Sequence, residues 1–245
     1  MEAASRVGRI IGVLIIMQMV GSAMVNGFLE APLFGAPGFL VNAAPHSRQI
    51  GLAAVLGLVT EAMWLGIAVT AFTIVYQRTQ RMALWFVALA VVILAMAVVE
   101  NIAVMSMVSL SEAYARASAV EREQLQTVRV VVASARNWAH FMARIIDGGA
   151  IFVFYAVLYR CALIPRALAG FGLIAAVLMV TAVGMPIFGH DVVFPMLAPM
   201  GVSQLLLALW LVAKGFRSQA SMREAAAERP NAPDERRGEQ GAARR

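Results

Sequence analysis

The chain has 245 residues, of which 61% are hydrophobic and 14% are charged, and its formal net charge is +6. A soluble domain carries roughly 25% charged residues, so this composition excludes an ordinary water-soluble protein and indicates an all-α, polytopic membrane protein. The one cysteine, Cys161, excludes a disulfide within the chain and a metal site of the CxxC type.

Six apolar stretches are long enough to cross a bilayer, because a spanning helix needs about 20 mainly apolar residues. The predicted spans are 9–29, 50–76, 83–109, 137–160, 166–186 and 195–214. They predict one bundle over residues 1–216. The first span is expected to be an anchor and not a cleaved signal peptide, because Gln18, Ser22 and Asn26 form a polar stripe at helical spacing.

Two further segments differ in composition from the spans. Residues 110–136 are rich in Ala, Glu, Gln and Arg, which predicts a short surface helix around 111–127 on the outer side of the membrane. Residues 217–245 contain almost no large apolar side chains and cannot form a core. They are expected to be a disordered cytoplasmic tail.

The orientation follows from basic residues near the ends of the spans. With six spans, the following bases share one side: Arg6, Arg9, Arg78, Arg81, Arg160, Arg166, Lys214 and Arg217. The positive-inside rule therefore predicts an inner (plasma) membrane protein with both termini in the cytoplasm. Because membrane topology accounts for the positive charge, the expected partner is the lipid bilayer and not a nucleic acid. A second copy of the chain or another membrane protein is an open alternative.

Polar residues recur at similar depth in the predicted spans. At 1.5 Å per residue, Glu61, Glu100 and Asp147 lie roughly 13–16 Å below the outer ends of their helices. Gln18 and Gln204 lie at about 14–16 Å. In a hydrocarbon core about 30 Å thick, these five side chains form a layer near the midplane.

The fourth span carries the densest polar stripe. Asn137, His140, Arg144 and Asp147 share one helix face, which predicts that this face lines the bundle interior or a water-filled cavity. Three carboxylates then face one permanent positive charge, that of Arg144. Protonation of a carboxyl, a bound cation or a protonated His140 would each relieve the imbalance.

A structural explanation of the polar layer stays open beside the functional one. Buried ion pairs can serve only to fix helix register. For Gln18 and Gln204, plain hydrogen bonds between helices are the favoured interpretation.

No motif for a cofactor or a catalytic nucleophile is present. The chain lacks a Walker loop, a dinucleotide fingerprint, an EF-hand pattern and GxSxG. Its three histidines show neither HxxxH nor HxH spacing. No cofactor and no metal site are expected.

Two motifs around the predicted fourth and fifth spans have a family resemblance, namely Leu158-Tyr159-Arg160 and Leu163-Ile164-Pro165-Arg166. The sixth span adds residues 207–212 (LALWLV) and then Lys214-Gly215-Phe216. With these motifs, and with Glu61 in the second span, the chain resembles the bacterial integral-membrane family described as domain of unknown function 4386. The resemblance is carried mainly by 137–216. It implies a multi-helix membrane protein and supplies no reaction, substrate or cofactor.

Three functional hypotheses follow from these features. The first is a bundle whose residues Glu61, Glu100, Arg144 and Asp147 bind or transport a proton, a cation or a small ligand. The second is a membrane-embedded enzyme that acts on a lipid or isoprenoid, with a carboxylate and His140 as acid and base. The third is a non-catalytic membrane subunit or regulator. A non-enzymatic role is favoured, because no catalytic constellation is recognisable.

Overall fold

The computed structural model describes residues 2–217, and within this range it contains six helices long and apolar enough to cross a membrane. They are α1 (Glu2–Met24), α4 (Ser47–Tyr76), α5 (Gln80–Arg116), α6 (Ala119–Arg160), α7 (Arg166–Gly184) and α8 (Ala198–Lys214). No strand occurs among the described residues. The prediction of an all-α polytopic bundle with six spans is confirmed. Apart from Arg217, the expected tail over 217–245 lies outside the described residues.

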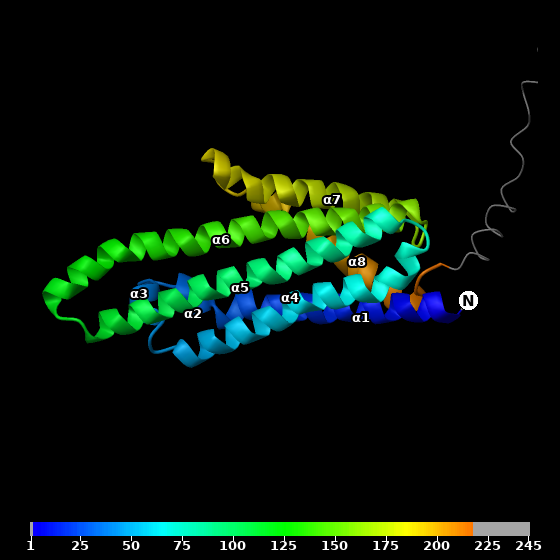
Figure 1. Ribbon diagram of the computed structural model, residues 1–245. Coiled ribbons are helices and arrows are strands. Elements are labelled where there is room, and N and C mark those ends of the chain that lie inside the picture. The colour runs from blue at the N-terminus through cyan, green and yellow to red at the C-terminus, as the bar shows by residue number, and fades with distance from the viewer. Residues whose placement is uncertain (1, 218–245) are drawn as a thin grey trace, which may run out of the picture.

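The six long helices pack as a closed ring. α1 contacts α4, and α4, α5, α6, α7 and α8 follow in sequence until α8 returns to α1 (Figure 1). Large side chains fill the interior, among them Phe86, Phe154, Tyr155 and Leu207. Many apolar residues on the outer faces stay exposed, as lipid-facing helix surfaces require.

The start of α1 and the end of α8 lie at one end of the bundle, which we call the Arg-rich end (Figure 1). Ser5 Oγ donates to the carbonyl of Lys214 at 3.4 Å, and the backbone N–H of Arg217 donates to Leu163 O at 2.9 Å. Arg78 Nη1 donates to Cys161 O at 2.7 Å, which joins the α4–α5 turn to the α6–α7 turn. The eight basic residues from Arg6 to Arg217 that the sequence analysis assigned to one side therefore lie at one end of the bundle, as six spans require.

The opposite end, which we call the hairpin end, carries the turn between α5 and α6 at Ala117 and Ser118 (Figure 1). The two helices have 37 and 42 residues, so they run about 55 and 63 Å and extend beyond a core about 30 Å thick. The separate surface helix expected over 111–127 is therefore wrong. Ser118 and Glu121 form a capping box that starts α6, and the helix-forming residues that follow continue it into the membrane.

The chain between α1 and α4 folds back over the hairpin end of the ring. α1 ends in a π-helical turn (Val25–Leu29), and the short helices α2 (Ala31–Phe34) and α3 (Phe39–Asn42) follow. Leu33, Phe39 and Leu40 pack with Val104 and Val108 of α5. This reversal holds Glu30, the residue after the π-helical turn, in a buried position.

Gly21 of α1 permits a close approach to α4. A Cβ at this position would overlap Thr60 Cγ2, and Thr60 precedes Glu61 on α4. The absence of a side chain at Gly21 thus brings α1 beside the polar part of α4.

We expect Gly21→Ala to destabilise the protein by about 1–3 kcal/mol, because the added methyl group overpacks the α1–α4 contact. Thermal unfolding in detergent measures the loss. Adding Thr60→Ser should recover much of it, because serine lacks Cγ2 and keeps the hydroxyl that donates to Gly57 O at 2.8 Å. A double variant no more stable than Gly21→Ala alone would contradict this account.

Candidate functional site

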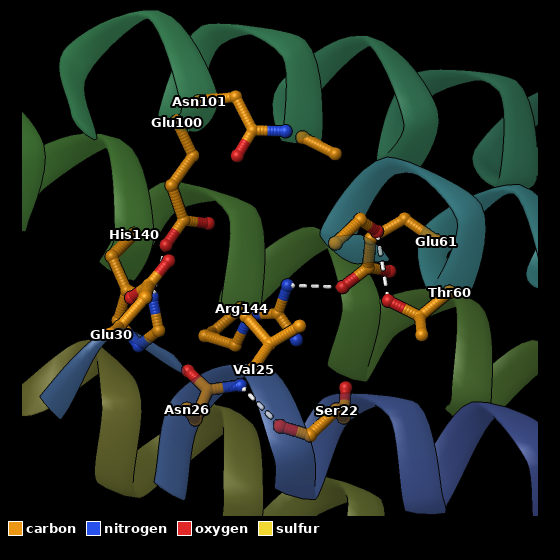
Figure 2. A pocket seen from close by; sticks show the side chains of 12 residues that line it. Ser22, Val25, Asn26, Glu30, Thr60, Glu61, Glu100, Asn101, His140 and Arg144 are labelled. Carbon is orange, nitrogen blue, oxygen red and sulfur yellow. Dashed lines mark hydrogen bonds and ion pairs between the residues drawn. The ribbon is translucent and has the colours of Figure 1, made fainter. Parts of the chain in front are cut away.

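A small polar cavity lies between α1, α4, α5 and α6 (Figure 2). Its volume is about 40 Å³. Its lining includes four of the predicted site residues on α4, α5 and α6, and the full set is Ser22, Val25, Asn26, Glu30, Gly57, Thr60, Glu61, Ala97, Glu100, Asn101, His140 and Arg144. The polar stripe of α1 contributes Ser22 and Asn26 to this lining, while Gln18 is buried outside it.

Arg144 joins two carboxylates from different helices. Its Nη2 lies 2.8 Å from Glu61 Oε1 on α4, and its Nη1 lies 3.2 Å from Asp147 Oδ2 on α6 itself (Figure 2 shows the pair with Glu61). In the ring α4 and α6 are separated by α5, so the Arg144–Glu61 pair crosses the interior of the bundle. Arg144 thus pairs with Asp147 along its own helix and with Glu61 across the bundle.

A second set of ion pairs lies nearer the hairpin end. His140 Nδ1 is 2.7 Å from Glu100 Oε1, and Arg136 Nη2 is 3.5 Å from the same oxygen. Arg136 Nη2 also lies 3.0 Å from Glu30 Oε2. Glu100 thus links an imidazole and a guanidinium, and Arg136 links Glu100 to the chain reversal after α1.

The sequence prediction of site residues missed Arg136 and Glu30. The spacing signal for Arg136 was present, since residues 136, 140 and 144 follow one another at helical spacing, but a span that starts at 137 leaves the arginine in a loop. No local pattern indicates Glu30, because only the chain reversal before α2 buries it beside α6.

We define the charge cluster as Glu30, Glu61, Glu100, Arg136, His140, Arg144 and Asp147. Four carboxylates face two guanidiniums and one imidazole. Even with a protonated imidazole, the ionised cluster carries an excess negative charge. Glu61 Oε2 and Asp147 Oδ1 are also buried without a hydrogen-bond partner in the range 2–217. Such oxygens are costly to leave unsatisfied in a low dielectric.

The charges form a column and not a single layer. Arg136 and Asp147 lie eleven positions apart on α6, which is about 16 Å along the helix axis. Glu100 pairs with His140 and Glu61 pairs with Arg144, one helical turn further along α6. Gln204 of α8 takes no part in the cavity lining.

Exposure of the column is highest in its middle. The exposed fraction of the side chain is 29% at His140 and 22% at Arg144, but only 7% at Arg136 on the hairpin side and 5% at Asp147. Beyond Asp147, towards the Arg-rich end, Phe154 stacks on Phe86 with ring centroids 5.0 Å apart and meets Trp64 edge-on at 6.5 Å. All three rings are buried. The charge cluster is therefore most exposed at His140.

The size and donor set of the cavity limit what it can hold. One water needs roughly 10–15 Å³ by this measure, so about three waters fit. Pockets for organic ligands measure about 300–1,000 Å³. Across residues 2–217, no group of three or more His, Cys, Asp or Glu side chains is placed to hold a metal ion.

We expect Arg136→Gln to destabilise the protein by about 3–5 kcal/mol, because it leaves the buried Glu30 carboxylate without its positive partner. Thermal unfolding in detergent is the measurement. The double variant Glu30→Gln/Arg136→Gln should be more stable than Arg136→Gln alone, since both charges are then absent. If the losses of the single variants Glu30→Gln and Arg136→Gln simply add up in the double variant, the ion pair contributes no coupling energy.

Comparison with known proteins identifies a family for this chain but no individual protein that matches it. No curated protein and no solved structure matches the chain. A family model described as a domain of unknown function, DUF4386, matches residues 10–215, which include all six spans almost entirely and the whole charge cluster. The chain therefore belongs to the DUF4386 family of multi-pass membrane proteins.

Proposed function

We propose that this protein binds protons at the charge cluster and that protonation controls its conformation within the membrane. The observation that carries the proposal is the excess of carboxylates over bases around the cavity, together with the unpartnered oxygens of Glu61 and Asp147. Ionisable residues inside a membrane are expensive to keep and typically belong to ion or proton pathways. A proton is the smallest species that relieves the excess charge.

Proton binding fits the cavity better than a larger ligand does. A volume of about 40 Å³ leaves room for a few waters and is too small for an isoprenoid or a lipid headgroup. This argues against the alternative of an enzyme that processes such a substrate in this cavity. The donor set likewise offers no cage of acidic and imidazole ligands for a metal cation.

Arg144 supplies a mechanism for the switch. With Glu61 and Asp147 both ionised, its guanidinium divides its hydrogen bonds between α4 and α6. When one carboxylate takes up a proton, the guanidinium pairs more strongly with the other, because charge-assisted hydrogen bonds are the stronger ones. The position of the proton is thereby coupled to the contact between α4 and α6, which is the two-state element that a switch requires.

The inferred path of the proton begins at His140, on the hairpin side of the aromatic layer. His140 is the most exposed ionisable group that lines the cavity and contacts Glu100, so it is the entry residue that we infer. The buried rings of Trp64, Phe86 and Phe154 block continuation to the Arg-rich end. Transport across the membrane would require this aromatic layer to open, whereas sensing of external pH would not. A closed aromatic layer therefore supports a sensor of external pH in preference to a transporter.

The predicted orientation belongs to the same proposal, with the hairpin end outside the cell and the Arg-rich end in the cytoplasm. The Arg and Lys residues at the ends of the spans support it. In a Cys161→Ser background, Ala117→Cys should react with a membrane-impermeant maleimide on intact cells, and Ala3→Cys only after permeabilisation. The reverse pattern of labelling would overturn the orientation.

Asp147→Asn is the direct test of proton binding. In the wild type, ionisation of Asp147 should lower thermal stability as pH rises, because burial in the bundle makes the proton-bound carboxyl the form that folding favours. Asp147→Asn or Glu61→Gln should weaken this fall and stabilise the protein at high pH. Thermal unfolding in detergent between pH 5 and pH 9 measures it.

The matched control is Glu123→Gln, which removes a carboxylate that is exposed on the hairpin. This variant should keep the pH profile of the wild type. If Asp147→Asn and Glu61→Gln also keep that profile, the charge cluster is a permanently ionised structural network and the proposed function is wrong.

A further inference from the structure

A second cavity lies at the Arg-rich end, between the α4–α5 turn and the α6–α7 turn. Its lining consists of Arg78, Thr79, Arg160, Cys161 and Ala162, and its volume is about 500 Å³. It lies where α4 and α6 leave the membrane, since those spans end at Tyr76 and Arg160. This cavity is separate from the charge cluster and takes no part in the proposed proton binding.

Two of the five residues that line this cavity are arginines, Arg78 and Arg160. Arg78 is held in place by its bond from Nη1 to Cys161 O, which orients the rest of its planar group. Arg160 is exposed and makes only a weak contact from Nη1 to Met82 Sδ at 3.8 Å within the described chain. Two such groups match the oxygens of a phosphate, for which arginine offers paired N–H donors.

The backbone around the cavity favours an anion as well. Thr79 is the N-cap of α5, its side chain makes no capping hydrogen bond, and the first turn of α5 contains no acidic residue. The positive end of the helix dipole is thus uncompensated by the protein at this point. On the other wall, Ala162 has a φ of 50°, which a non-glycine residue rarely adopts and which the surrounding structure must enforce.

The turns that border the cavity carry no carboxylate in the described part of the chain. The turns 77–79 and 161–165 contain neither Asp nor Glu, and the same holds for 215–217 beside them. Exposed aromatic residues Tyr76, Trp85 and Tyr159 mark the level at which membrane headgroups begin. From the cavity, its two arginines and its position at the membrane surface, we propose that it binds the phosphate headgroup of an anionic phospholipid.

The test compares two variants that each lose one positive charge at the same end of the bundle. Arg160→Gln removes a guanidinium from the cavity. Arg166→Gln removes an exposed guanidinium that lies over the Tyr159 ring and does not line the cavity. Arg78→Gln is less suitable, since it also breaks the bond to Cys161 O that joins the two turns. Binding is titrated on purified full-length protein, by thermal shift or native mass spectrometry, with phosphatidylglycerol, phosphatidylcholine and inorganic phosphate as separate probes.

Phosphatidylglycerol should bind and stabilise the wild type, phosphatidylcholine should do so much less, and Arg160→Gln should weaken phosphatidylglycerol binding about tenfold, as expected for one lost charged hydrogen bond. Arg166→Gln should bind as the wild type does. Equal losses in the two variants would mean diffuse attraction by all the bases and would overturn the proposal. Stabilisation by inorganic phosphate equal to that by phosphatidylglycerol would overturn the assignment to a lipid.

Discussion

Burial of charge in a low-dielectric interior is the constraint on which the rest of this structure depends. Arg144 cannot stay in the membrane without carboxylates, and the nearest ones come from α4 and from its own helix. The guanidinium therefore ties together two helices that are not neighbours in the ring. Helices that face lipid gain little from hydrophobic association, so such polar contacts and close packing of small residues must specify how they assemble.

The same constraint explains why the chain reverses over the hairpin end. Arg136 and Glu30 are both almost fully buried, and each supplies the other with an opposite charge. α2 and α3 cover this pair and pack on α5, while Ser111 Oγ donates to Leu40 O at 2.9 Å and accepts from Ala44 N–H at 2.8 Å. In the cavity below, His140 is the most exposed charged residue of the lining.

Sequence alone was sufficient for the six spans, because long apolar runs have few alternatives to a membrane-spanning helix. It also singled out Glu61, Glu100, His140, Arg144 and Asp147, since a charged residue within an apolar run is easy to recognise, and the structure joins them in ion pairs. The rest depended on information that hydropathy does not hold. A span boundary drawn at residue 137 hid Arg136, because the polar beginning of a long helix resembles a loop. The pairing of Glu61 with Arg144 joins positions 83 residues apart, and only the ring arrangement brings them together.

α6 is an unbroken helix from Ala119 to Arg160, so it connects the hairpin end of the bundle directly to the Arg-rich end. It carries four members of the charge cluster near its middle, the hairpin turn at its start and an arginine of the second cavity at its end. For a rigid helix, a tilt of about 5° around Asp147 displaces Ala119 by roughly 4 Å, since the two lie about 42 Å apart along the axis. In the proposed switch, a change of the contact made by Arg144 would therefore move the start of α6 more than its middle, and lipid bound at Arg160 would act on the other end of the same helix.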